Sequence, residues 1–307
     1  MNFFKVIQMV ILCFPFLLIS GCIETEENEI SEAKAATEVR SLVFAIYTAD
    51  KASSTVKEFA PVIAWLEEDI SKRLGETIKI RMQVSDQYLK AIGDLVEGRA
   101  DFSRLGPASY IKAFEDNPEL DLLAMESKNG ERFLKGIFAV HKDSQIDSLK
   151  EVKGRSFAFG DPLSTIGRYL CQAELLKVGI SDKDLSYYEF LGRHDTVGMA
   201  VAAKDFDVGA LKSSSFRKLM ESGEPLRKLA DFDSVTKPWV SHPDLDPEVR
   251  DALRAAMLEI TDEDAEKIGL DGFLKAKDEY YEPIRRSMAE SEGFSFKKRG
   301  DRISQAD

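Results

Sequence analysis

Short apolar runs alternate with amphipathic stretches along the first half of the chain. Residues 41–47 form an almost unbroken apolar run, which is typical of a strand buried in a parallel sheet. From residue 59 to residue 74, apolar side chains recur three and four positions apart, which predicts an amphipathic helix that ends at Gly75. Further runs of strand length lie at residues 77–84, 101–105, 120–125 and 134–140.

A second set of the same kind begins at residue 156. The pattern predicts strands at residues 156–159, 187–191 and 206–211, with helices between them, and a helical segment from residue 247 to residue 286. Strands that alternate with helices imply parallel sheets joined by right-handed crossovers, and two such sets imply two lobes. The pattern therefore predicts an α/β protein with parallel-rich sheets and flanking helices.

The first residues have the pattern of an export signal. A short basic segment that ends at Lys5 precedes an apolar stretch, residues 6–18, which is too short to span a membrane comfortably. Ser20 and Gly21 stand directly before Cys22 and resemble a bacterial lipobox, in which cleavage frees the cysteine for lipidation. An ordinary signal peptide with a chance cysteine is the alternative. A tether rich in Glu and Ala follows, and no later segment is apolar enough to span a membrane, so we expect a lipid-anchored protein.

Composition excludes several classes of function. The formal charge of −12, from 42 basic and 54 acidic residues, argues against broad nucleic-acid binding and against electrostatic attachment to anionic lipids. Cys171 is the one cysteine of the predicted globular part, which leaves no partner for a disulfide and no cysteine zinc site. The three histidines are scattered and form no metal motif. We therefore predict neither a cofactor nor a metal.

Two hydroxyls, Ser164 and Thr165, lie in the turn between the strand at 156–159 and the helix that follows it. Unpaired backbone N–H groups and the positive end of the helix dipole point toward such a turn. Together with the hydroxyls, these groups predict an anion site that needs no lysine. The structural alternative is that Ser164 only caps the helix.

Four segments resemble the phosphate/phosphite/phosphonate-binding proteins of ABC importers. The clearest is Asp161-Pro-Leu-Ser-Thr-Ile-Gly167, which is similar to that family's Asp-Pro-x-Ser-Thr-Ser-Gly turn; the others are residues 100–110, 193–197 and 205–210, in the family's order and spacing. The resemblance implies a two-lobed periplasmic-binding-protein-like fold of type II, with an oxyanion held in the cleft between the lobes. It predicts a signal peptide (1–21), a flexible tether (22–40), lobe 1 from residues 41–136 plus 233–307, and lobe 2 from residues 137–232.

Four more side chains are candidates for the ligand site. His194 starts a predicted helix and can donate to a ligand oxygen, while Tyr47 ends the first strand, where open α/β sheets place ligands. Tyr110 follows the Gly-Pro turn, and either phenol can donate to an oxyanion. Asp207 can accept from a protonated ligand oxygen. The alternatives are a helix-cap loop for His194, simple packing for the two tyrosines and a surface position for Asp207.

Two positions depart from the family pattern. Ile166 stands where the family often has a second serine, and the segment from Lys212 to Ser215 offers no acid for the amine of an aminophosphonate. These departures leave the identity of the oxyanion open.

The resemblance implies a solute-binding lipoprotein that captures phosphate, phosphite or a phosphonate and delivers it to the permease subunits of an ABC importer. We expect a monomer, held by its lipid anchor on the periplasmic or cell-surface side of a membrane, with no enzymatic activity. A sensory protein that reports an oxyanion to a membrane histidine kinase or cyclase is the alternative, because the same cleft serves both. A hydrolase that uses Ser164 and His194 is disfavoured, since the sequence around Ser164 lacks the Gly-x-Ser-x-Gly elbow.

Overall fold

The computed structural model describes residues 39–292 and residue 294. The predicted signal peptide, Cys22 and nearly all of the predicted tether lie outside these residues. Among the helices that are described, none combines the length and the apolar character needed to cross a membrane.

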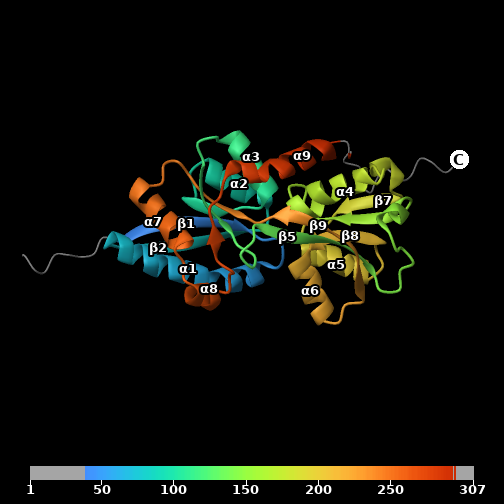
Figure 1. The fold of residues 1–307 in the computed structure, drawn as a ribbon, viewed down its shortest axis with the longest axis horizontal. Coiled ribbons are helices and arrows are strands. Elements are labelled where there is room, and N and C mark those ends of the chain that lie inside the picture. The colour runs from blue at the N-terminus through green and yellow to red at the C-terminus, as the bar shows by residue number, and fades with distance from the viewer. Residues whose placement is uncertain (1–38, 293, 295–307) are drawn as a thin grey trace, which may run out of the picture. The chain divides into compact units, whose positions relative to one another are not determined.

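One sheet has six strands in the order β11-β4-β10-β3-β1-β2 (Figure 1). Its first three strands in the sequence, β1 (Val39–Tyr47), β2 (Thr77–Ser85) and β3 (Phe102–Arg104), run parallel, as the apolar runs predict. β10 (Pro238–Ser241) enters between β3 and β4 (Asp121–Glu126) and is antiparallel to both, and β11 (Phe273–Leu274) completes the sheet. The sequence pattern did not predict β10 or β11.

The other sheet has five strands in the order β7-β6-β8-β5-β9. The three strands β6 (Ser156–Phe159), β7 (Tyr187–Phe190) and β8 (Val208–Lys212) are parallel. β5 (Phe133–His141) is antiparallel to β8 and to β9 (Leu226–Val235), an edge strand that the sequence pattern missed. Phe133 pairs with Val235, so the chain enters and leaves this sheet side by side. We propose that the predicted lobe boundaries lie along this pair of strands.

Helices cover both faces of each sheet (Figure 1). On the six-stranded sheet, α1 (Ala52–Leu74), α7 (Pro247–Leu258) and α8 (Asp262–Ile268) share one face, and α2 (Tyr88–Val96) and α3 (Pro107–Asp116) lie on the other. On the five-stranded sheet, α5 (His194–Ala202) and α6 (Ser213–Glu221) lie opposite α4 (Cys171–Lys177) and α9 (Glu282–Ser291). Short helical turns complete the chain at Leu149–Val152, Thr165–Leu170, Asp182–Asp184 and Asp278–Tyr281.

Aromatic rings form the centre of the packing between the six-stranded sheet and α1. Trp239 of β10 is fully buried and stacks on Phe44 of β1, with 4.9 Å between ring centroids. Phe59 of α1 and Phe102 of β3 pack around this pair. Burial of these rings against α1 stabilises the end of the sheet that carries Tyr47 and Arg104.

Candidate functional site

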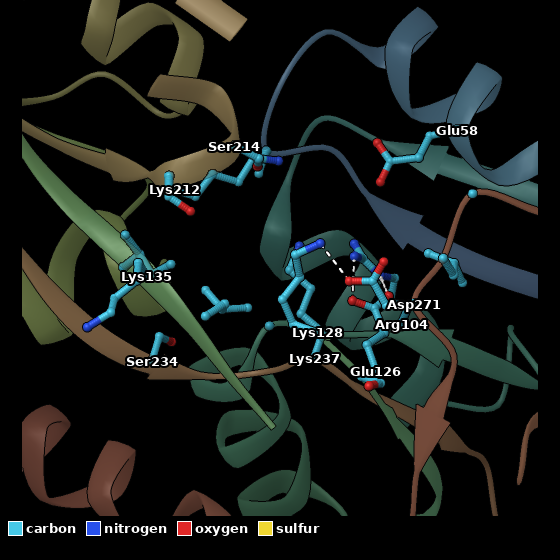
Figure 2. Close-up of a pocket in the computed structure, with 18 of the residues that line it drawn as sticks. Glu58, Arg104, Glu126, Lys128, Lys135, Lys212, Ser214, Ser234, Lys237 and Asp271 are labelled. Atoms are coloured by element: carbon cyan, nitrogen blue, oxygen red, sulfur yellow. Dashed lines mark hydrogen bonds and ion pairs between the residues drawn. The ribbon is translucent and has the colours of Figure 1, made fainter. Parts of the chain in front are cut away.

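A cavity of about 1370 Å³ is lined by residues from both sheets and their helices (Figure 2). Four of the predicted site residues lie in its wall: Tyr47, Ser164, Thr165 and His194. They come from the end of β1, the turn after β6 and the start of α5. These are the carboxyl ends of parallel strands and the segments that follow them, where α/β sheets form their ligand sites.

The turn after β6 is built by its own hydroxyls. Ser164 Oγ accepts a hydrogen bond from the backbone N–H of Gly167 at 2.9 Å, so the capping alternative describes a real contact. Thr165 Oγ1 accepts from the backbone N–H of Ala108 at 2.9 Å, which joins this turn to the start of α3. Each hydroxyl accepts in these contacts and keeps its own hydrogen as a donor.

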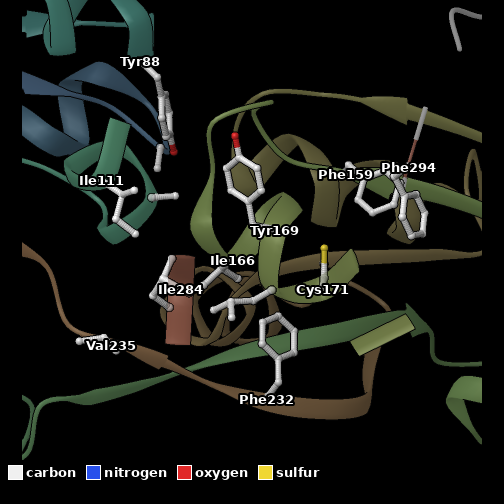
Figure 3. Packing of buried hydrophobic residues seen from close by; sticks show 14 of the residues in the cluster. Tyr88, Ile111, Phe159, Ile166, Tyr169, Cys171, Phe232, Val235, Ile284 and Phe294 are labelled. Atoms are coloured by element: carbon white, nitrogen blue, oxygen red, sulfur yellow. The ribbon is translucent and has the colours of Figure 1, made fainter. Parts of the chain in front are cut away.

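The underside of this turn is anchored in apolar packing. The chain continues from Thr165 as one turn of π-helix before α4, and Ile166, Tyr169 and Cys171 point into a buried cluster that includes Ile284 of α9 (Figure 3). Ile166 therefore belongs to this cluster while it also lines the cavity. Cys171 is fully buried and burial raises the pKa of its thiol, which makes it a packing residue.

Two tyrosines form one wall of the cavity. Tyr47 Oη accepts from the backbone N–H of Gly106 at 2.6 Å and is 3.0 Å from Ser109 Oγ. Burial raises the pKa of Tyr47 to about 12, so the phenol stays neutral. Tyr88, at the start of α2, stacks on Tyr47 with 3.7 Å between ring centroids and also lines the cavity. Tyr88 was not among the site residues predicted from the sequence, although its place just after β2 was a signal for the site.

His194 also lines the cavity. Its backbone N–H donates to Ala49 O at 2.9 Å, and its side chain is buried. Burial lowers the pKa of the imidazole to about 3, aided by the positive charges of Lys212 and Lys237 and opposed by Asp50. Within residues 39–292 and 294, Nδ1 of His194 has no hydrogen-bond partner. A neutral imidazole with an unpaired buried nitrogen therefore lies in the cavity wall.

Charge around the cavity favours anions. Its lining contains nine Lys or Arg side chains against five Asp or Glu, although the whole chain carries a formal charge of −12. A cleft of one sign raises the local concentration of ligands of the other sign. The sequence predicted an anion site that needs no lysine, and the structure adds Lys212 and Lys237 to the lining that holds the predicted hydroxyls.

Lys212 is paired with a carboxylate that sequence reasoning missed. Its Nζ lies 2.5 Å from Asp50 Oδ2, and Ser215 Oγ donates to Asp50 Oδ1 at 2.9 Å. Burial would raise the pKa of Asp50, but the charge and hydrogen bond of Lys212 lower it. Asp50 follows β1 and Lys212 ends β8, so this ion pair joins the two sheets' ends next to the cavity.

Two predicted site residues lie elsewhere. Tyr110 Oη donates to Asp278 Oδ1 at 2.8 Å and its ring packs against Tyr281. Its side chain therefore faces the short helical turn that precedes α9. Asp207 is exposed and accepts from the backbone N–H and the hydroxyl of Ser156. Asp207 precedes β8 and therefore lies at the amino ends of the strands, away from the cavity at their carboxyl ends. These positions correct the prediction that the two side chains bind ligand.

Comparison with known proteins gives one family. A family model described as "ABC transporter, phosphonate, periplasmic substrate-binding protein" matches residues 44–281. The phosphate-import protein PhnD of Mycolicibacterium smegmatis is 25% identical over 254 residues, which are 78% of this chain and 77% of that protein. A probable phosphite-binding protein of an ABC transporter, PhnD1 of Prochlorococcus marinus, is 23% identical over 57% of this chain and 60% of that protein.

The fold also has solved relatives. The structure of PhnD1 from Prochlorococcus marinus in complex with methylphosphonate superposes with a TM-score of 0.70 and 21% identity, covering 84% of this chain and all of that one. A structure described as having the generic periplasmic binding protein fold superposes with a TM-score of 0.55. The fold class predicted from the sequence, mixed α/β with two sheets and flanking helices, is confirmed.

Proposed function

Because this chain belongs to the family of periplasmic phosphonate-binding proteins of ABC transporters, we propose that it captures a small phosphorus oxyanion and delivers it to the permease of an importer. The ligand is phosphate, phosphite or a phosphonate. The family consists of substrate-binding proteins and not of enzymes, so the predictions of the family and of a non-enzyme are confirmed.

The unpaired Nδ1 of His194 is the observation that carries the proposal. A buried polar atom without a partner is unfavourable, and a ligand that supplies the missing hydrogen bond gains binding energy there. The hydroxyls of Ser164 and Thr165 and the phenols of Tyr47 and Tyr88 line the same cavity and add neutral donors. Lys212 and Lys237 supply positive charge beside the imidazole. We infer that the phosphoryl oxygens lie among these groups.

A panel of ligands tests the proposal. Methylphosphonate, phosphite and phosphate are each added to the purified protein, and the unfolding midpoint is followed. A ligand at 100 times its Kd stabilises the native state by about 2.7 kcal/mol, which corresponds to roughly 5–10 °C for a fold of this size. If none of the three raises the midpoint, the proposal fails.

His194→Phe isolates the role of the imidazole. It keeps a buried ring and removes both nitrogens, so we expect about 10- to 100-fold weaker binding of the best ligand by calorimetry, the value of one hydrogen bond to a charged group. His141→Phe is the matched control, because His141 Nδ1 accepts from the backbone N–H of Asp143 at the far end of β5, outside the cavity lining. Equal affinities of both variants and the parent would remove His194 from the site.

We also propose that Cys22 carries a lipid anchor that holds the protein, as a monomer, on the outer face of a membrane. The lipobox pattern before Cys22 supports this part of the proposal. Cys22→Ser should move the protein from the membrane fraction to the soluble extracytoplasmic fraction, measured by fractionation and immunoblotting. Membrane association that is unchanged in the variant would exclude lipidation at this residue.

A further inference from the structure

The cavity continues beyond the groups that suit one phosphoryl group. Arg104, Lys212 and Lys237 line it together, from β3, β8 and the segment between β9 and β10 (Figure 2). We call these three side chains the cationic wall. The segments that carry them lie far apart in the sequence. Because β10 pairs with β3, Trp239 lies opposite Arg104, and Lys237 is only two residues before Trp239.

Two members of the cationic wall already have carboxylate partners. Arg104 binds both carboxylate oxygens of Glu126, and Lys212 pairs with Asp50. Lys237 is different, since no ion pair or side-chain hydrogen bond of its amine is found among residues 39–292 and 294. The Lys237 amine is thus a partly buried cation with no anionic partner among the described residues.

The electrostatic surroundings of Lys237 support this conclusion. Burial, together with the charges of Arg104 and Lys212, lowers the pKa of the Lys237 amine to about 7, whereas Glu126 and Glu58 act in the opposite direction. Lys237 also acts on the pKa values of Glu126, which Arg104 keeps ionised, and of His194, which is neutral. An anionic group placed beside the amine would reverse the unfavourable balance and favour its charged form.

The size of the cavity leaves room for such a group. Ligand pockets for molecules of drug size span about 300–1,000 Å³, and this cavity is about 1370 Å³. A bare phosphonate occupies a small part of that space. Ser213 and Ser214 at the start of α6 and Ser234 of β9 also line it and can donate to a second acceptor group.

We propose that the ligand of this protein is a phosphonate with a second anionic group, a carboxylate, which pairs with Lys237 at the cationic wall while the phosphoryl group lies by His194. This inference rests on the proposed function and specifies its substrate class. It predicts discrimination against aminophosphonates, whose ammonium group would face Lys212 and Lys237.

The binding test uses ligand pairs of equal length. Calorimetry on the unmodified protein compares 3-phosphonopropionate with propylphosphonate, and phosphonoacetate with ethylphosphonate; 2-aminoethylphosphonate is the cationic probe. We expect at least one carboxylated ligand to bind tenfold or more tightly than its uncharged match, and 2-aminoethylphosphonate to bind more weakly than ethylphosphonate. If alkylphosphonates bind as tightly as both carboxylated ligands, the inference fails while the proposed function stands. If no phosphonate, phosphite or phosphate binds, the proposed function fails as well.

Variants assign the preference to one side chain. Lys237→Met should weaken the binding of the carboxylated ligand at least tenfold more than the binding of its alkylphosphonate match, which removes the carboxylate preference, and Lys237→Arg should keep that preference. Lys57→Met is the matched control: Lys57 lies exposed on α1 in the same lining and does not line the small recess that Arg104, Lys212 and Lys237 share, so the variant loses the same charge away from the cationic wall. An equal loss for both ligand types in Lys237→Met, or the same loss in Lys57→Met, would overturn the assignment to Lys237.

The pH profile gives a second readout. The quantity to follow is the affinity of the parent for the carboxylated ligand divided by the affinity of Lys237→Met for the same ligand. This ratio should fall by up to about tenfold between pH 6 and pH 8, because the amine loses its proton over that range. The ligand's own ionisation cancels in the ratio. Circular dichroism and unfolding without ligand verify that each variant folds. A ratio that is constant across this pH range would contradict a salt bridge between Lys237 and the carboxylate.

Discussion

Ser164→Leu is expected to abolish ligand binding. Ser164 is buried at the start of the helical segment, where its Oγ accepts from Gly167 N and lies in the cavity wall. The side chains of Tyr88 and Ser164 also form a hydrogen bond. Leucine replaces the hydroxyl with a branched apolar group that fills the space proposed above for the phosphoryl oxygens. If the parent binds with micromolar affinity, the loss should exceed about 4 kcal/mol, which leaves no heat signal in calorimetry at millimolar ligand.

Thr165→Val serves as the matched variant for Ser164→Leu. It keeps the side-chain shape and removes one hydroxyl, so we expect a loss of about 1–2 kcal/mol in binding. Loss of the cap in Ser164→Leu should lower the free energy of unfolding by about 1 kcal/mol without preventing folding. Undiminished binding by Ser164→Leu, with a folded variant, would place the phosphoryl site elsewhere in the cavity.

Glu126→Gln should have the largest effect on stability. Glu126 of β4 receives two hydrogen bonds from the guanidinium of Arg104, and both side chains are only 12% exposed. The guanidinium also lies 4.7 Å above the centroid of the Phe59 ring. Removal of one partner of a buried ion pair leaves an uncompensated charge, which costs about 3–5 kcal/mol. Urea unfolding of the parent and the variant should show this difference at pH 7.

The effect of Glu126→Gln should depend on pH. Burial would raise the pKa of Glu126, but the charge and hydrogen bonds of Arg104 lower it. A carboxyl whose folded-state pKa is lowered contributes stability above its unfolded pKa, near 4.3, and loses it as pH falls through the folded value. The difference between parent and variant should therefore shrink as pH falls below about 4.

Two comparisons keep the stability prediction testable. The double variant Arg104→Met/Glu126→Leu removes both charges and should regain much of the lost stability. Asp116→Asn removes one partner of an exposed pair with Lys112 and should change the free energy of unfolding by less than about 1 kcal/mol. A loss in Glu126→Gln no larger than that of Asp116→Asn would show that the buried pair behaves like a surface pair.

Local pattern was sufficient for the parallel strands and for the turn that carries the hydroxyls. The apolar run predicted at residues 41–47 is β1, because a strand buried on both faces must be apolar throughout. The run at 77–84 is β2, an edge strand in which apolar and polar residues alternate. The turn after β6 was recognisable from its own residues, since capping contacts such as Ser164 to Gly167 span only three positions. The four-segment resemblance added the family and named His194, which lines the cavity, as a candidate for the site.

β9 and β10, which the sequence pattern missed, are stabilised by the strands that they pair with. β9 lies at the edge of its sheet, and its sequence shows neither a continuous apolar run nor a clear alternation of apolar and polar residues. β10 has only four residues and begins with a proline, which gives no strand signal, yet its Trp239 is fully buried between β3 and β4. Its antiparallel entry into the first sheet depends on the path of the whole chain.

The chemistry of the cavity divides in the same way. The sequence alone determined the hydroxyl turn, the neutral aromatic donor at the end of β1 and the histidine at the start of α5, because each lies next to a recognisable strand end. Only the tertiary structure decided that Asp207 and Tyr110 point elsewhere and that Arg104, Lys212 and Lys237 converge. Charges that meet across a cleft are far apart in the sequence, and their partners, burial and pKa values come from the packing of both sheets, which no local pattern encodes.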